Sequence, residues 1–180
     1  ITGTNGAAAI AGDDAGDVKE DDVLTASGVL TIADEDTGEA ELQPLAAGTA
    51  GDNGYGTFEL VSGTWTYALN NAAVQSLDAG QVVQDTHTFT ASDGRTQTVT
   101  VTITAVNDEP AAIEGTLAAV EDTTAGGTLS ATDVDGPSLT YAILTNGSRG
   151  TAAVTNSATG AYTYTPHAGT SGPDTFTFQV

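Results

Sequence analysis

The sequence predicts an all-β protein built from two tandem β-sandwich modules. Apolar and polar residues alternate along several short segments, as they do in half-buried strands. Thr, Val and Gly are abundant where strands and turns are expected. The same series of motifs also occurs twice. We expect a first module over residues 1–106 and a shorter second module over residues 107–180.

The repeated motifs keep their order along the chain, which indicates the duplication of a module. The clearest pairs are residues 18–21 (VKED) with 119–122 (AVED), 63–67 (GTWTY) with 160–164 (GAYTY), and 85–89 (DTHTF) with 174–178 (DTFTF). The modules differ most at residues 69–83, which the second replaces with the shorter stretch 166–173. We expect a helical turn around residues 72–77.

Strands are expected wherever the alternation is clear. In the first module they are residues 29–32, 56–60, 64–69, 86–91 and 96–106. In the second they are residues 117–120, 128–131, 139–144, 151–155, 161–165 and 175–180. The first module closes with a long strand after the turn Ser92-Asp93-Gly94, and the second stops before such a strand. We therefore expect the second module to lack its last strand and to leave one sheet edge unpaired.

The charge of the chain limits its partners. The sequence has 24 Asp and Glu against three Lys and Arg, a formal net charge of −21. Nucleic acid and anionic membrane surfaces are excluded, because both are bound through Lys and Arg. No apolar run is long enough for membrane insertion. The chain also has no Cys, so bound metal is the expected substitute for disulfides, although the acids also favour solubility.

The acidic residues repeat with the modules and gather around the joint between them. Each module has an early acidic pair and an Asp-x-Asp motif after a strand, and the joint reads Asn-Asp-Glu-Pro. Ca²⁺ prefers several oxygen ligands, including carboxylates and Asn carbonyls. We expect a calcium site at the central joint with ligands from Glu20, Asn107, Asp108, Asp133 and Asp135.

Four further acids are weaker candidates for metal ligands. Asp34 and Asp36 would serve an upstream joint that has lost an acid and a proline, and Glu121 is the second-module counterpart of Glu20. Asp93 lies in Ser92-Asp93-Gly94, which is also a good hairpin turn without any metal. For each single Asp, capping of a turn stays open as the alternative.

The remaining side chains with functional chemistry point away from catalysis. His87 and His167 have no nucleophile nearby in the sequence, so we expect no enzyme. Trp65, Tyr67, Tyr162 and Tyr164 fit either a sugar-stacking platform or core packing. Binding of carbohydrate or of another cell-surface molecule is thus the alternative function.

The chain resembles the VCBS and bacterial cadherin-like repeats of large secreted adhesins. The motifs that carry the resemblance are residues 92–94 (SDG), 101–104 (VTIT), 107–110 (NDEP), 120–123 (VEDT), 133–136 (DVDG), 162–166 (YTYTP) and 174–178 (DTFTF). The first module is similar to the VCBS type and the second to the shorter cadherin-like type. The resemblance implies Greek-key, immunoglobulin- or cadherin-like sandwiches with calcium at module junctions. It also implies an extender or adhesion role in a secreted or bacterial cell-surface protein, next to further modules of the same chain.

Overall fold

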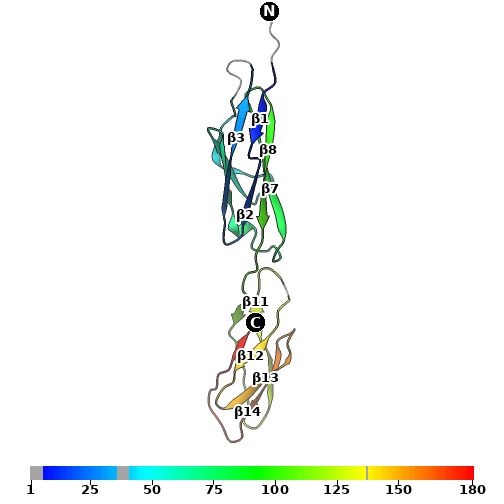
Figure 1. Ribbon diagram of the computed structural model, residues 1–180. Coiled ribbons are helices and arrows are strands. Elements are labelled where there is room, and N and C mark those ends of the chain that lie inside the picture. Colours follow the sequence, from blue (N-terminus) through cyan, green and yellow to red (C-terminus); the bar gives the residue numbers. More distant parts are fainter. Residues whose placement is uncertain (1–5, 36–40, 137) are drawn as a thin grey trace, which may run out of the picture. The chain divides into compact units, whose positions relative to one another are not determined.

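The computed structural model describes residues 6–35, 41–136 and 138–180, which form strands, turns and one short 3-10 helix (Figure 1). The chain divides into two compact units, Ile1–Asn107 and Asp108–Val180. The predicted all-β class is confirmed. Each unit is described below by itself.

The first unit is a sandwich of two sheets. One sheet has the antiparallel order β1-β3-β6-β5-β4, and the other has the order β2-β8-β7. The strands of the first sheet are β1 (Ala9–Gly12), β3 (Thr25–Ala33), β4 (Leu45–Ala50), β5 (Gly56–Val61) and β6 (Thr64–Leu69). Those of the second are β2 (Ala15–Lys19), β7 (Val82–Thr90) and β8 (Thr96–Thr104). The 3-10 helix η1 (Asn71–Ala73) lies where a helical turn is expected.

The core of the first unit follows from the alternation along its strands. Val99, Val101 and Ile103 of β8 are completely buried, and the Thr residues between them face outward. They belong to one apolar cluster with Trp65 of β6 and Phe58 of β5. Each such buried side chain contributes about 1.5–3 kcal/mol to stability.

The chain changes sheets between β1 and β2, and this change positions the acids that follow. At Gly12, φ is 121°, and a Cβ there would collide with the Val29 carbonyl. Asp13 donates its N–H to the Val29 carbonyl at 2.9 Å, and its side chain accepts the Val29 N–H at 3.1 Å. The Asp14 carbonyl then accepts the Thr100 N–H of β8. As a result β2 runs parallel to β8, and both strands end at the same edge.

The strands β1, β2 and β4 are not among those the sequence predicts. Gly and Asp residues interrupt the alternation in the segment that contains β1 and β2. The strand β4 carries a register shift between Leu45 and Thr49, so its side chains do not follow a simple period of two.

The second unit has three small sheets, with the orders β10-β14-β13, β11-β9 and β12-β15. Its strands are β9 (Ala111–Ile113), β10 (Ala125–Thr128), β11 (Ser130–Thr132), β12 (Ala142–Thr145), β13 (Gly150–Asn156), β14 (Ala161–Pro166) and β15 (Thr177–Gln179). The buried core consists of Leu129, Tyr141, Ala152, Tyr162 and Tyr164.

The strand expected at residues 117–120 is absent from the structure, so that prediction is wrong. These residues are irregular, and Val120 is 70% exposed. The counterpart in the first module is β2, which is held by its pairing with β8. Within the described residues of the second unit, no strand corresponds to β8, so nothing holds residues 117–120 extended.

A buried aspartate ties the two sheets of the first unit together. The Asp85 carboxylate, on β7, is completely buried. It accepts the backbone N–H groups of Asn53, Tyr55 and Gly56 at 2.9–3.1 Å, and the Tyr67 hydroxyl at 3.1 Å. Burial of the Tyr67 hydroxyl raises the pKa of Tyr67, and the negative charge of Asp85 beside it raises this pKa further. The carboxylate thus closes the turn before β5 against the opposite sheet.

The second unit repeats this arrangement at the corresponding positions. The Asp174 carboxylate accepts the N–H groups of Ser148 and Arg149 at 2.9 and 3.0 Å, and the Tyr164 hydroxyl at 2.7 Å. These hydrogen bonds lower the pKa of Asp174, with the bond from Tyr164 as the largest cause. We call Asp85–Tyr67 and Asp174–Tyr164 the Asp–Tyr locks.

The Asp174–Tyr164 lock predicts that Gly147 cannot be replaced by a larger residue without loss of stability. A Cβ at Gly147 would overlap the Asp174 carboxylate, whereas one at Gly115 would meet no atom within 4 Å. Gly147→Ala should push the carboxylate off its donors and lower the urea midpoint of unfolding. Gly115→Ala, the matched control, should change stability by about 0.5 kcal/mol at most. Urea unfolding of both variants measures the difference, and equal midpoints would contradict the lock.

Candidate metal centre

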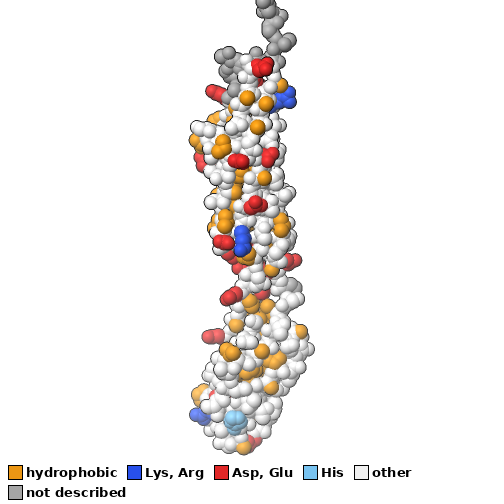
Figure 2. Space-filling model, in the orientation of Figure 1, with side chains coloured by type: hydrophobic (Ala, Val, Ile, Leu, Met, Phe, Trp, Pro, Cys, Tyr) orange, Lys and Arg blue, Asp and Glu red, His pale blue; other side chains and the backbone are white. Residues whose placement is uncertain are grey.

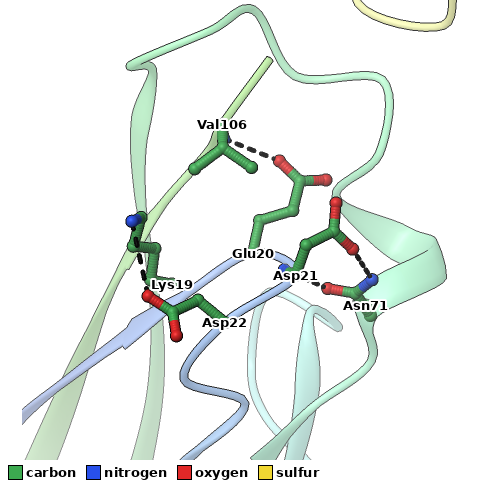
Figure 3. A network of polar contacts seen from close by, with 6 residues as sticks. All are labelled: Lys19, Glu20, Asp21, Asp22, Asn71 and Val106. Atoms are coloured by element: carbon green, nitrogen blue, oxygen red, sulfur yellow. Dashed lines mark hydrogen bonds and ion pairs between the residues drawn. The ribbon is translucent and has the colours of Figure 1, made fainter. Parts of the chain in front are cut away.

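Glu20 lies directly after β2, at the edge where β2 and β8 end together. Its side chain is completely buried. One carboxylate oxygen accepts the Val106 N–H at 2.9 Å (Figure 3). The Glu20 N–H donates to the Thr104 carbonyl at 3.1 Å. A carboxylate that loses its water at such a position needs donors or a cation in return. The parallel pairing therefore brings Glu20 to the chain segment that leaves the first unit.

Asp21 adds a second carboxylate to this edge. Its backbone has φ 56°, a left-handed value that turns the chain sharply. The Asn71 side chain accepts the Asp21 N–H at 3.0 Å and donates to the Asp21 carboxylate at 2.5 Å. Carboxylate oxygens of Asp21 and Glu20 lie within 4.8 Å of one another, as Figure 3 illustrates. Sequence reasoning did not include Asp21 as a ligand, although the repeated Glu-Asp pair was a usable signal.

The nearby ion pair between Lys19 and Asp22 does not involve the carboxylates of Glu20 and Asp21. Lys19 and Asp22 are 3.4 Å apart, and both side chains are largely exposed. A surface pair of this kind contributes little to stability. It leaves the negative charge of Glu20 and Asp21 without a neutralising cation among the described residues of the first unit.

The second unit gathers three of the predicted ligands by itself. The Asp108 N–H donates to the Asp135 carboxylate at 2.5 Å, and the Asp135 N–H donates to the Asp133 carboxylate at 2.9 Å. Asp135 is only 9% exposed. Its Oδ1 is buried and has no hydrogen-bond partner among the residues that the structure describes. Buried polar atoms in native proteins nearly always have a partner, which makes this oxygen a candidate metal ligand.

Asp93 and Asp34 lie at the opposite end of the first unit from Glu20. Asp93, in the turn before β8, accepts the N–H groups of Ala8 and Arg95, both at 2.9 Å. Asp34 follows β3, where Ala33 is paired with Ala9. The nine residues of β8 span about 30 Å, so neither acid can share an ion with Glu20. The contacts of Asp93 are those of a turn cap, the alternative that the sequence left open. Asp36 lies outside the described residues.

Glu121 is exposed, unlike its counterpart Glu20. The turn beside it is the same, because Asp122 has φ 57° and Asp21 has φ 56°. Glu20 is buried against the end of β8, and that strand has no counterpart in the described part of the second unit. Asn107, the remaining predicted ligand, is exposed between Val106 and Asp108.

The aromatic residues do not form a sugar-stacking platform. Trp65 and Tyr67 are buried in the first unit, and Tyr162 and Tyr164 in the second. The Trp65 indole N–H donates to the Asp13 carbonyl at 2.7 Å, so the polar edge of the indole faces the segment between β1 and β2. His87 packs between Phe58 and Phe89. Figure 2 shows acidic side chains spread over the visible face of the first unit, with apolar side chains occurring mostly singly.

The comparisons with known families follow the same division of the chain. Residues 5–105 match the model of the bacterial cadherin-like domain. The chain belongs to the bacterial cadherin-like domain family. Residues 107–180 match the model of the bacterial Ig domain. The resemblance to bacterial cadherin-like repeats is confirmed, although the cadherin-like match covers the first module rather than the second. The VCBS type of the first module stays a prediction.

The other two comparisons add little to this family assignment. No curated protein matches the chain. Among solved structures, the extracellular domain of protocadherin GammaB4 is similar, with 16% sequence identity and a TM-score of 0.44. The match covers 91% of this chain and only 30% of that chain.

Cadherin-like and Ig-like domains imply an adhesion or extender module on the cell surface or in a secreted protein, and such families are typically non-enzymatic. Domains of the cadherin-like type typically bind calcium. In the described ranges, no helix combines the length and the apolar character that crossing a membrane requires.

The contacts of Asp93 predict a specific pH dependence. Hydrogen bonds from the backbone of Arg95 and Ala8 lower the pKa of Asp93 below 3.8. Its stabilising contribution is therefore complete above the ordinary Asp pKa and is lost as the pH falls through the lowered value. Between about pH 6 and pH 2, Asp93→Asn should lose less melting temperature than the wild type. The exposed Asp17→Asn variant should follow the wild type. Parallel curves for all three proteins would refute this role.

Proposed function

We propose that this chain is a pair of extender modules from a large secreted or surface protein, and that calcium makes their joint rigid. The proposed ligands are Glu20, Asp21, Asn107, Asp108, Asp133 and Asp135. The ion would neutralise the carboxylates around the joint and remove freedom of rotation there. Asp34 and Asp36 would serve an upstream joint in the same way, and Glu121 a downstream one.

The observation that carries the proposal is the Oδ1 atom of Asp135, which is buried and unpartnered within the described residues. Asp133 and Asp108 hold Asp135 through two hydrogen bonds, so its carboxylate has a defined orientation. The proposed donors are all oxygen atoms, without His or Cys, and this chemistry favours Ca²⁺ over transition metals.

The hydrogen bonds of the chain segment between the units also support the proposal. Glu20 accepts the N–H of Val106, and Asp135 accepts the N–H of Asp108. These two N–H groups are two residues apart in the sequence, about 7 Å along the backbone. Two acids thus accept N–H groups that are close together in the sequence. A cation bound by such carboxylates would neutralise the repulsion between their like charges.

The expected affinity fits an extracellular role. Calcium sites of extracellular modules have dissociation constants on the order of 10⁻⁴ to 10⁻³ M. Such a site would be occupied where calcium is millimolar and empty in a cytoplasm with little calcium. The chain would then be flexible before export and stiff afterwards.

Calcium should raise the melting temperature of the chain. Saturation at 100 times the dissociation constant adds about 2.7 kcal/mol to the free energy of unfolding. In modules of this size that corresponds to a rise of about 10 °C or more. Thermal unfolding in millimolar calcium and in a chelator measures the shift, and identical curves would exclude the calcium site.

A matched pair of variants tests the ligands. Asp135→Asn keeps the size of the side chain but removes the charge of the unpartnered carboxylate, so most of the calcium-dependent shift should disappear. Asp17→Asn removes one exposed charge on β2 and should keep the full shift. Equal shifts in the two variants would show that Asp135 is not a ligand.

A further inference from the structure

The segment at residues 69–83 carries amide side chains next to the carboxylates of Glu20 and Asp21. It is the stretch that the second module replaces with residues 166–173, which contain neither Asn nor Gln. The 3-10 helix η1 opens it, and Asn71 at its start is hydrogen bonded to Asp21.

The segment is fixed to the body of the first unit close to the end of β8. Val74 is completely buried in the core cluster. The Gly80 N–H donates to the Ala105 carbonyl at 3.0 Å, and the Ala105 N–H donates to the Gln81 carbonyl at 2.9 Å. Gln75, next to Val74, is therefore held beside the edge that Glu20 occupies.

The Gln75 amide bridges the two carboxylates. Its Nε2 lies 2.7 Å from Oε1 of Glu20 and 3.3 Å from Oδ1 of Asp21. The other oxygen of Glu20 accepts the Val106 N–H. Both oxygens of the buried Glu20 thus have a donor, in contrast to Asp135 in the second unit.

An amide NH2 group in this position partly replaces the electrostatic effect of a cation. Each N–H carries a partial positive charge, which offsets the repulsion between two carboxylates held close together. A neutral donor is weaker than a divalent ion, so calcium can replace it. The amide nitrogen cannot bind calcium, so the NH2 group of Gln75 would have to leave the two carboxylates when the ion arrives.

We infer that Gln75, assisted by Asn71, takes the place of calcium between Glu20 and Asp21 when the metal is absent. This inference rests on the proposed calcium site. It makes Gln75 and Asn71 positioning residues that keep the acids of the first module aligned at low calcium. The pair Glu121 and Asp122 has the same backbone turn but is exposed, and the segment 166–173 supplies no amide side chain.

The test is thermal unfolding of the full chain in chelator and in saturating calcium, for the wild type, Gln75→Ala and Asn70→Ala. Asn70 is exposed beside η1 and makes no side-chain cap hydrogen bond, so its variant is the matched control. In chelator, Gln75→Ala should melt about 5 °C or more below the wild type, because Glu20 loses a donor. In calcium the gap should shrink to about 2 °C or less, so the calcium-dependent rise becomes larger.

The alternatives give different outcomes. An equal loss for Gln75→Ala in both conditions would mean that Gln75 is only structural, and a smaller calcium-dependent rise would mean that it is a ligand of the bound ion. Either result overturns the inference while the wild-type shift still supports the proposed function. A wild type without any shift would overturn both. Gln75→Glu adds a third carboxylate and should enlarge the calcium-dependent rise in melting temperature beyond that of the wild type. A smaller rise than in the wild type would overturn the inferred exchange of the Gln75 amide for calcium.

Discussion

The parallel pairing of β2 with β8 determines where the acids of the first unit lie. It exists because the chain changes sheets at Gly12, Asp13 and Asp14, where a side chain larger than hydrogen would not fit at position 12. With both strands ending together, Glu20 is buried against the exit of the unit. Glu121 shows the reverse case: without a described counterpart of β8, the same motif stays exposed.

The acidic residues of this chain differ in the hydrogen-bond donors that their carboxylate oxygens receive. Asp85 is buried but receives N–H groups and a hydroxyl, so it needs no cation. Asp93 caps a turn in the same way at the surface. Asp135 is buried with one oxygen left unpartnered in the described residues. Burial alone therefore does not identify a metal ligand, and the unpartnered oxygen is what singles out Asp135.

The sequence predicts the parts of the structure that depend on local pattern. The strands β5, β6 and β8 follow from alternation, and Glu20 and Asp135 follow from the repeated acidic motifs. The Asp–Tyr locks were visible only as repeated motifs, because their role depends on turns 25 to 32 residues away in the sequence. The Gln75 bridge to Glu20 spans 55 residues and has no repeat. No local pattern connects two such positions, so only the fold reveals them.

The acids of this chain thus differ in how completely their oxygens are hydrogen bonded within the described residues. The Asp–Tyr locks use only N–H and O–H donors from within one unit, so each unit holds these turns in place without metal. Asp135, in contrast, keeps one buried oxygen without a donor among the described residues. In the proposed function, the modules of this chain, with its net charge of −21 and no Cys, would fold without metal, and calcium would make their joint rigid only after export. Gln75 and Val106 give both oxygens of Glu20 a donor without metal, and in the inferred exchange a calcium ion would take the place of the Gln75 amide.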